Sequence, residues 1–356
     1  MASAPVSAPS APAPPPRAFC VALGANGPLK LTGQSVQDFS AALSQASIAW
    51  IDLTLDHLAE EAPAAASSLG FSQALATALL ARPTSAYEDL ETELGLAVPA
   101  VRIDALQVRV TPLLVLLRKG LIVTLHSPEI GRMGRLYRYA DIVMKKLKSS
   151  LAWNDRLTLF LTRILDENND SNFAGLRKIE EEGGKIGKLL IEPASIRPEV
   201  GKEIYQMKQA LIAYLDALWA TLDVVNSLRY GDAETITDEP RLLQRVAILG
   251  EEVNRHISLS EQMSTVLASG LEVLQSIYNN QLTILNNRIS YVAFLLALAG
   301  TAFLAPNTLA TIGPEALGLE RGSPLWLPLL GLSSFVSTLV VYTVIRLKGW
   351  IPRTQA

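Results

Sequence analysis

The sequence predicts an α/β cytoplasmic domain followed by long helices and a two-helix transmembrane hairpin. Three observations support this fold class. Short runs rich in β-branched residues alternate with helical patterns up to about residue 150, a proline-free pattern covers 241–288, and two uncharged apolar runs lie near the end of the 356-residue chain. Charged residues make up only 18%, below the roughly 25% of soluble domains, and the mean hydropathy is +0.26. Part of the chain is therefore expected to contact membrane lipid.

Composition also excludes several classes of function. The formal net charge of −3 argues against a nucleic-acid partner, because phosphate binding needs a concentrated basic face. A single cysteine, Cys20, excludes an intramolecular disulfide and a cysteine-based zinc cluster. The chain has no nucleophile motif and no phosphate-binding Gly-x-x-x-x-Gly-Lys loop, so we predict neither an enzyme nor a bound cofactor. His126, beside a strand end, is expected to be a packed or surface histidine.

Two segments are long enough to cross a bilayer as helices. No residue is charged in 289–314 or in 322–345, and each run exceeds the ~20 residues that span ~30 Å of hydrocarbon. Two buried core helices are the alternative, but core helices of this length normally carry a polar stripe. We therefore place the first transmembrane span at 289–313, an external loop at 314–323 and the second span at 324–345.

Basic residues flank this hairpin on one side. Arg288 precedes the first span, and Arg346, Lys348 and Arg353 follow the second. Because basic residues stay cytoplasmic, we expect the large N-terminal part and a basic tail at 346–356 to lie in the cytoplasm. The chain is then an integral protein of the cell (inner) membrane.

The rest of the chain divides by composition. Residues 1–17 are rich in Pro, Ala and Ser and lack the apolar core of a signal peptide, so a disordered tail is expected. Residues 18–150 form the predicted α/β domain, which is large enough for a core of its own. Its expected strands are 19–23, 48–53, 106–110, 113–117 and 121–125, and its expected helical pieces are 57–81 and 131–149.

Helical patterns follow from residue 151. A helical pair is predicted over 151–240, with its second helix at 199–228. A stalk helix is predicted over 241–288, and no helix-breaking residue separates it from the first span. One continuous helix of about 60 residues, or ~90 Å at 1.5 Å per residue, should therefore run from the cytoplasm into the bilayer.

The stretch before the first span carries amides instead of charges. Asn280 and Asn287 lie seven residues apart and so share one helix face. If several copies of the helix surround an axis, this face forms rings of amide oxygens followed by an apolar neck, which suits a hydrated divalent cation. Packing between helices or at the bilayer surface is the alternative role of these amides. Further positions on the face are Tyr291, Leu295, Leu298, Ala302 and Ala305.

This layout resembles the CorA family of divalent-cation transport proteins over nearly the whole chain after residue 17. In that family the first span ends in a Gly-Met-Asn signature, which is not intact here. On one match Ala305-Pro306-Asn307 takes its place, and only the asparagine survives. On the other match Pro306 corresponds to a proline common in the family's first span, residues 313–315 take the place of the signature, and only Gly313 survives.

The resemblance implies a funnel-shaped homopentamer whose first span lines a pore for Mg²⁺, or for Zn²⁺, Co²⁺ or Ni²⁺. The ion passes hydrated into the cytoplasm down its electrochemical gradient, and no cofactor is implied beyond the transported ion. The role at the external mouth falls on Asn307 or on Gly313, Pro314 and Glu315. By position, the pore-lining roles fall on Ile284, Asn287, Leu295, Leu298 and Ala302.

The family's cytoplasmic domains bind Mg²⁺ between subunits through acidic residues and close the pore at high internal concentration. Candidate regulatory ligands are Glu251, Glu252 and Glu261 on the stalk, and Asp89, Glu91 and Glu93 in the first domain.

A membrane-anchored sensor or scaffold that has lost conduction is the alternative function, because the altered signature and the apolar neck at Leu295 and Leu298 fit it as well.

Overall fold

The computed structural model of the protein describes residues 17–82, 85–148, 150–191, 198–317 and 324–348. By the contacts within it, the chain divides into two compact units, Met1–Gly270 and Leu271–Ala356. The expected disordered tail falls almost wholly on 1–16, outside the described residues.

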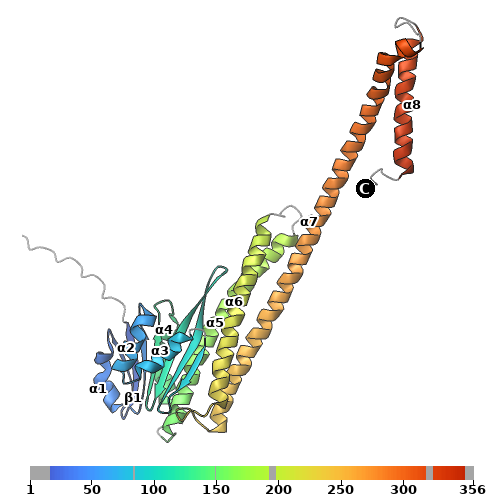
Figure 1. The fold of residues 1–356 in the computed structure, drawn as a ribbon. Helices are drawn as coiled ribbons and strands as arrows, with labels where there is room; N and C mark the ends of the chain where they lie inside the picture. Colours follow the sequence, from blue (N-terminus) through green and yellow to red (C-terminus); the bar gives the residue numbers. More distant parts are fainter. Residues whose placement is uncertain (1–16, 83–84, 149, 192–197, 318–323, 349–356) are drawn as a thin grey trace, which may run out of the picture. The chain divides into compact units, whose positions relative to one another are not determined.

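A sheet forms the centre of the first unit (Figure 1). Its strands are β1 (Ala18–Gly24), β2 (Gly27–Gly33), β3 (Ile48–Thr54), β4 (Ala86–Asp89), β5 (Glu93–Asp104), β6 (Gln107–Arg118) and β7 (Leu121–His126). They lie in the order β2-β1-β3-β7-β6-β5-β4. The pair β3 and β7 is parallel, and every other neighbouring pair is antiparallel.

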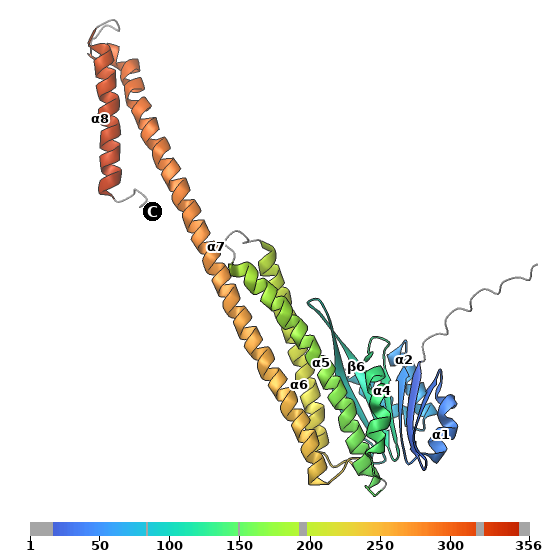
Figure 2. The same cartoon turned by 180° about the vertical axis from the view of Figure 1, so that it is seen from behind.

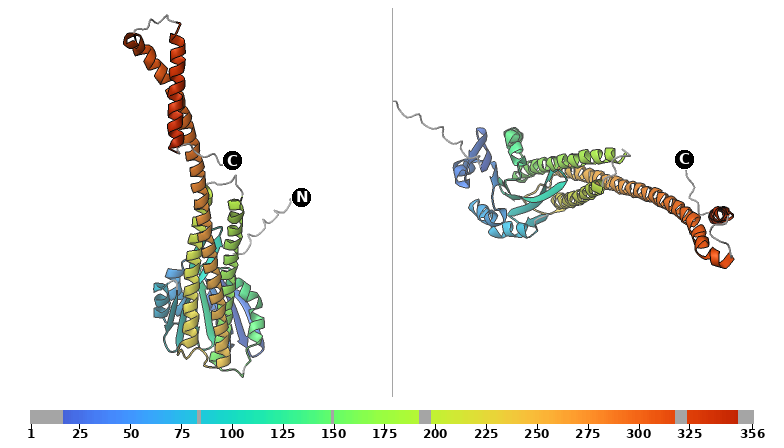
Figure 3. Two further views of the ribbon diagram at one scale, coloured as in Figure 1. Left: turned by 90° about the vertical axis from the view of Figure 1, so that its right-hand side faces the viewer. Right: turned by 90° about the horizontal axis from the view of Figure 1, so that it is seen from above.

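Helices cover both faces of this sheet (Figures 2 and 3). One face packs against the short 3₁₀ helix η1 (Val36–Phe39) and against α1 (Ser40–Gln45), α2 (Leu58–Ser68) and α3 (Gln73–Ala81). The other face packs against α4 (Arg132–Lys145), α5 (Trp153–Ile191) and α6 (Pro198–Tyr230).

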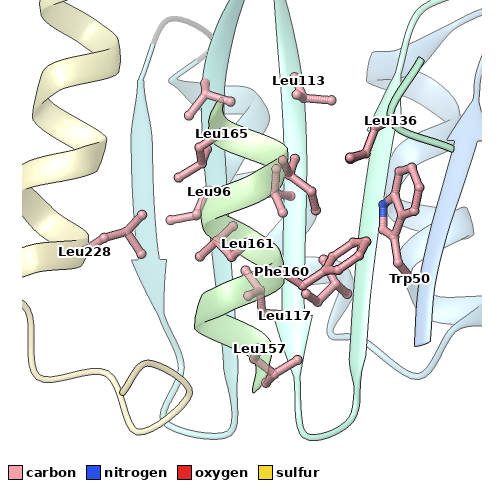
Figure 4. Close-up of a cluster of buried hydrophobic side chains, with 14 of the residues drawn as sticks. Trp50, Leu96, Leu113, Leu117, Leu136, Leu157, Phe160, Leu161, Leu165 and Leu228 are labelled. Carbon is pink, nitrogen blue, oxygen red and sulfur yellow. The ribbon is translucent and has the colours of Figure 1, made fainter. Parts of the chain in front are cut away.

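Alternation along the strands produces two hydrophobic cores, because successive side chains point to opposite faces. Trp50 and Ile122 point into the core under α4–α6, where the Trp50 and Phe160 rings lie 5.5 Å apart. Ile51 and Val123 point into the core under α1–α3. Figure 4 shows leucines and Phe160 of α5 packed over the strands of the first core.

Residues 18–150 complete the core under α1–α3 by themselves, but not the core on the other face of the sheet. The core under α4–α6 also contains Phe160 of α5, Val224 of α6 and Val246 from the helix that follows. A sheet with two apolar faces needs a layer of helices on each face. For the face under α4–α6, residues 18–150 supply only α4. The expected helical pair therefore completes the sheet domain.

The sequence prediction missed strands that contain proline, glycine or acidic residues. The strands β2, β4 and β5 were not expected, and β6 is one strand where two short ones were predicted. Pro112 of β6 lies opposite Pro99 of β5. These prolines are tolerated because β4 pairs with β5 only as far as Ala97, and β7 pairs with β6 only from Leu114 onward. No described strand pairs with the outer side of β5 at Pro99 or with the outer side of β6 at Pro112. The N–H group that each proline lacks is therefore not needed there for strand pairing.

Side chains from α4 and α5 bond to β5 beyond the end of β4. The Val101 N–H donates to Asn172 Oδ1 at 2.8 Å, and Arg132 Nη2 donates to the Val101 carbonyl at 2.6 Å. The Pro99 carbonyl accepts from Nδ2 of both Asn168 and Asn172, at 3.0 and 3.1 Å. Burial lowers the pKa of Arg132 to about 10, which leaves its guanidinium charged at neutral pH.

Glycine divides one of the expected helical segments and leaves another intact. The helical piece at 57–81 is split into α2 and α3 at Gly70, whose φ of +79° favours glycine. The Gly183-Gly184 pair lies inside α5 without ending it. The second helix of the pair, expected at 199–228, is α6.

Two further helices carry the apolar runs. The first, α7 (Pro240–Leu317), has 78 residues, or about 117 Å at 1.5 Å per residue. It is longer than expected because it continues through Pro306 and Pro314. In the second unit, the end of α7 lies beside α8 (Trp326–Leu347). Of the expected external loop and basic tail, 318–323 and 349–356 lie outside the described residues.

Among the described residues, three helices are long and apolar enough to cross a membrane by length and composition: Val200–Tyr230, Pro240–Glu315 and Trp326–Leu347. In the first of these, half of the most apolar window is buried inside the protein, against none in the other two. The apolar residues of α6 serve the sheet core, for which Val224 and Leu228 are examples. The first expected span, 289–313, lies within α7, and the second, 324–345, overlaps α8.

We expect Asn172→Leu to lower the free energy of unfolding by about 1–3 kcal/mol, because the Val101 N–H would stay buried without an acceptor. Asn169→Leu is the matched control on the same helix. Both amide atoms of Asn169 are buried and lack a hydrogen-bond partner among the described residues, so this change should be neutral or stabilising. Chemical denaturation of the full chain in detergent measures both, and equal losses would contradict the assignment.

Candidate pore-lining face

The amide-rich segment of α7 is exposed from residue 279 onward. Every residue from 279 to 290 is exposed, including Asn280, Ile284 and Asn287. Within the part of the chain that the structure describes, the side-chain amides of Asn280 and Asn287 have no hydrogen-bond partner. Their oxygens and nitrogens are therefore available to water, to an ion's hydration shell or to another chain.

Further along α7 the predicted face meets α8. Tyr291 and Leu295 remain 47% exposed, whereas Leu298 and Ala302 are half-buried. The hydroxyl of Ser334 in α8 donates to the Ala302 carbonyl at 2.6 Å. The seven predicted positions thus share one helix face, but α8 covers the part of it that lies within the span.

In this part of the span, the exposed residues lie on the side of α7 opposite the predicted face. Leu296 and Phe303 are 68% and 77% exposed, and Gly300 and Asn307 are also exposed. Sequence periodicity did not identify this side, because every side of the helix is apolar here and the position of α8 has no sequence signal. The pore-lining roles of Leu298 and Ala302 stay predictions.

The two candidate positions for the external mouth have different surroundings. Asn307 presents an exposed amide, next to the half-buried Ala305 and Pro306. Gly313 is buried against α8, and a Cβ added there would lie 2.9 Å from Cη2 of Trp326. The packing of the two helices therefore accounts for the glycine at 313. Of the remaining residues at this end, Glu315 is exposed.

The candidate regulatory acids do not form a metal site within one chain. Asp89 ends β4, where its Oδ1 accepts from the Glu91 N–H at 3.0 Å. Glu251 is exposed on α7, and Oε1 of the half-buried Glu252 lies 3.6 Å from Nη2 of Arg255. Among the described residues, no group of three or more His, Cys, Asp or Glu side chains lies close enough to hold a metal ion.

Comparison with known proteins identifies the family of this chain. The sequence profile of the family described as CorA-like Mg²⁺ transporter protein matches residues 45–312. The chain belongs to the CorA family. No curated protein matches the sequence.

Solved structures share the CorA fold. The CorA magnesium transporter from Methanocaldococcus jannaschii has a TM-score of 0.68 and 19% identity, covering 94% of this chain and 98% of its own. The full-length CmaX protein has a TM-score of 0.62 and 17% identity, covering 93% and 98%. The ZntB cytoplasmic domain from Vibrio parahaemolyticus has a TM-score of 0.54 and 13% identity, covering 74% and 98%. At these identities the likeness shows the fold.

One buried polar network of this CorA-family chain lies outside the predicted face. His126 Nε2 lies 3.1 Å from Oδ1 of Asp52, and both side chains are almost fully buried. Thr124 donates to Asp52 and accepts from Nε1 of Trp50 at 3.1 Å. Burial acts to lower the pKa of His126, but the Asp52 carboxylate outweighs it, so that the pKa is raised. His126 is a packed histidine, as expected.

We expect the protonated form of His126 to stabilise the fold. A pKa raised above the ordinary value of about 6.5 gives a stability that is complete below about pH 6.5 and is lost as the pH rises through the raised pKa. His126→Gln should flatten this fall in the free energy of unfolding, measured by denaturation at a series of pH values. The control is His57→Gln, on an exposed histidine, and an equal effect of both substitutions would contradict the assignment.

Proposed function

We propose that several copies of the chain form a pore through which a hydrated divalent cation enters the cytoplasm. The observation that carries this proposal is a pair of exposed amides, Asn280 and Asn287, immediately before an uncharged span in a chain of the CorA family. Neither amide has a hydrogen-bond partner among the described residues. Amide oxygens can hydrogen-bond the water shell of a divalent ion without removing it. A single helix cannot enclose an ion, so the amides need a ring of chains.

The membrane potential is sufficient to drive this passage. A charge of 2+ that moves down 100 mV gains about 4.6 kcal/mol, twice the value for one charge. The sequence has no phosphate-binding loop for ATP. Transport is therefore passive in this proposal, and it needs no cofactor besides the transported ion.

The number of copies and the location follow from the family resemblance and the charge pattern. We take the assembly to be a homopentamer in the inner membrane, in contact with lipid through the exposed apolar side chains of α8. Arg288 lies before the first span and Arg346 after the second. Both basic residues favour a cytoplasmic location for the start of the first span and the end of the second. The ion is Mg²⁺, with Zn²⁺, Co²⁺ and Ni²⁺ as the other candidates.

Regulation by cytoplasmic metal would need acidic residues of two chains. Glu251 and Asp89 are exposed and Glu252 is half-buried, which leaves carboxylate oxygens free to face a neighbouring subunit. We propose these three as ligands between subunits, since none of them completes a site alone.

A non-conducting sensor or scaffold is the second candidate. It is favoured by the loss of the Gly-Met-Asn signature, of which one residue survives on either match. Uptake by the purified protein in liposomes decides between the two, with Mg²⁺, Zn²⁺, Co²⁺ and Ni²⁺ compared side by side. A conducting pore takes up at least one of these ions, whereas a scaffold takes up none.

Asn307→Ala is expected to reduce uptake about fivefold, the effect of losing roughly 1 kcal/mol of hydrogen bonding to the hydrated ion at the barrier. Thr308→Ala is the control, because Thr308 is exposed beside Asn307 and its hydroxyl bonds to the Leu304 carbonyl of its own helix. Initial rates in proteoliposomes measure both variants. Unchanged uptake by the Asn307 variant would remove this residue from the mouth.

Asn287→Ala should change the relative rates of Mg²⁺ and Zn²⁺ uptake, because an amide ring contributes to holding the water shell of the ion. Asn286→Ala is the matched control, on an exposed amide about 100° around the helix from Asn287. Competition uptake assays in proteoliposomes compare the two. The same response from both variants would mean that the face is wrongly assigned.

A further inference from the structure

Pro306 leaves one carbonyl of α7 without its helical donor. In an α-helix the N–H of each residue donates to the carbonyl four positions earlier, and proline has no N–H. The helix continues through Pro306, so the Ala302 carbonyl lacks this bond. In hydrocarbon no water replaces a missing donor, and the carbonyl needs one from the protein.

The donor comes from the neighbouring helix. Ser334 Oγ of α8 donates to the Ala302 carbonyl at 2.6 Å. One position earlier, Ser333 donates to the Leu330 carbonyl of its own helix at 2.8 Å. Both serines are half-buried on α8, and they differ in which helix they bond.

We propose that Ser334 is a positioning residue: its hydroxyl replaces the N–H that Pro306 lacks and so fixes the turn of α7 that precedes Asn307. The bond ties Ala302 to α8 on one side of the helix, and Asn307 is exposed on the opposite side. Ser337 supports the same turn, with Oγ 3.1 Å from the Thr301 carbonyl. The consequence for ion passage rests on the proposed function, whereas the bond itself does not.

Ordinary contact between helices is the competing explanation, and the two differ in their dependence on Pro306. If Ser334 replaces a missing donor, Pro306→Ala makes its hydroxyl dispensable, because the substituted alanine would supply the N–H within α7. If Ser334 only joins two helices, its removal has the same effect whether residue 306 is proline or alanine.

A double-mutant cycle on the full chain in mild detergent tests this. The unfolding equilibrium is measured by denaturant titration for Ser334→Ala and Pro306→Ala, alone and combined. Hydrogen bonds between membrane helices change this equilibrium from about threefold on average to about twentyfold at most. We expect Ser334→Ala to fall in the upper part of that range with Pro306 present, and to have less than about a twofold effect with Pro306→Ala.

Two further variants test the proposal without a change at Pro306. Ser333→Ala should change the equilibrium little, and Ser334→Thr should retain stability because it keeps the hydroxyl. These comparisons decide the outcome if Pro306→Ala does not fold. Equal effects of Ser334→Ala in the two backgrounds, or equal effects of Ser333→Ala and Ser334→Ala, would overturn the proposal.

Uptake assays form a separate arm. With the wild type conducting, Ser334→Ala should reduce the initial rate of uptake, as Asn307→Ala does, and Ser334→Thr should retain the wild-type rate. An unchanged rate in Ser334→Ala would overturn the positioning role. If the wild type transports none of the four ions, the proposed function fails, and the cycle still decides whether Ser334 replaces the missing donor.

Discussion

A peptide carbonyl in hydrocarbon has no water to bond with, and this constraint governs the second unit. It requires the spans to be helices, since only a helix satisfies its backbone within one segment. It also explains why α7 can pass through Pro306 without ending, because the hydroxyl of Ser334 bonds to the carbonyl that the proline leaves open. The contact between α7 and α8 therefore includes hydrogen bonds to the backbone of α7 as well as apolar packing.

The same helix begins in a different environment. Near its start, Val246 and Leu249 of α7 are buried in the core beneath the sheet, and from 279 to 290 every residue is exposed. Along one continuous backbone, α7 changes from a core helix of the first unit to a helix whose side chains are free for other chains. In this chain, one continuous helix therefore joins the sheet domain to the proposed pore.

Much of this fold could be predicted from the sequence because its signals are long. Uncharged runs and a proline-free pattern identify α7 and α8, and short apolar runs identify β3 and β7. The strands β4 and β5 were missed because proline, glycine and acidic residues interrupt the alternation. At the candidate site, the spacing from Asn280 to Ala302 defines one face of a helix, but it holds no information on the side that α8 covers. Ligands contributed by separate subunits leave no local pattern, so the acids near Glu252 were only candidates.

The bonds that Asn172 and Arg132 make to β5 have a consequence for solubility during folding and assembly. A strand with open N–H and carbonyl groups is a template on which a second polypeptide can add its own strand, and such additions begin aggregates. Here the Val101 groups and the Pro99 carbonyl are occupied by side chains, and proline offers no donor. Where β4 stops short, the outward backbone groups at Pro99 and Val101 are therefore not open to a second strand.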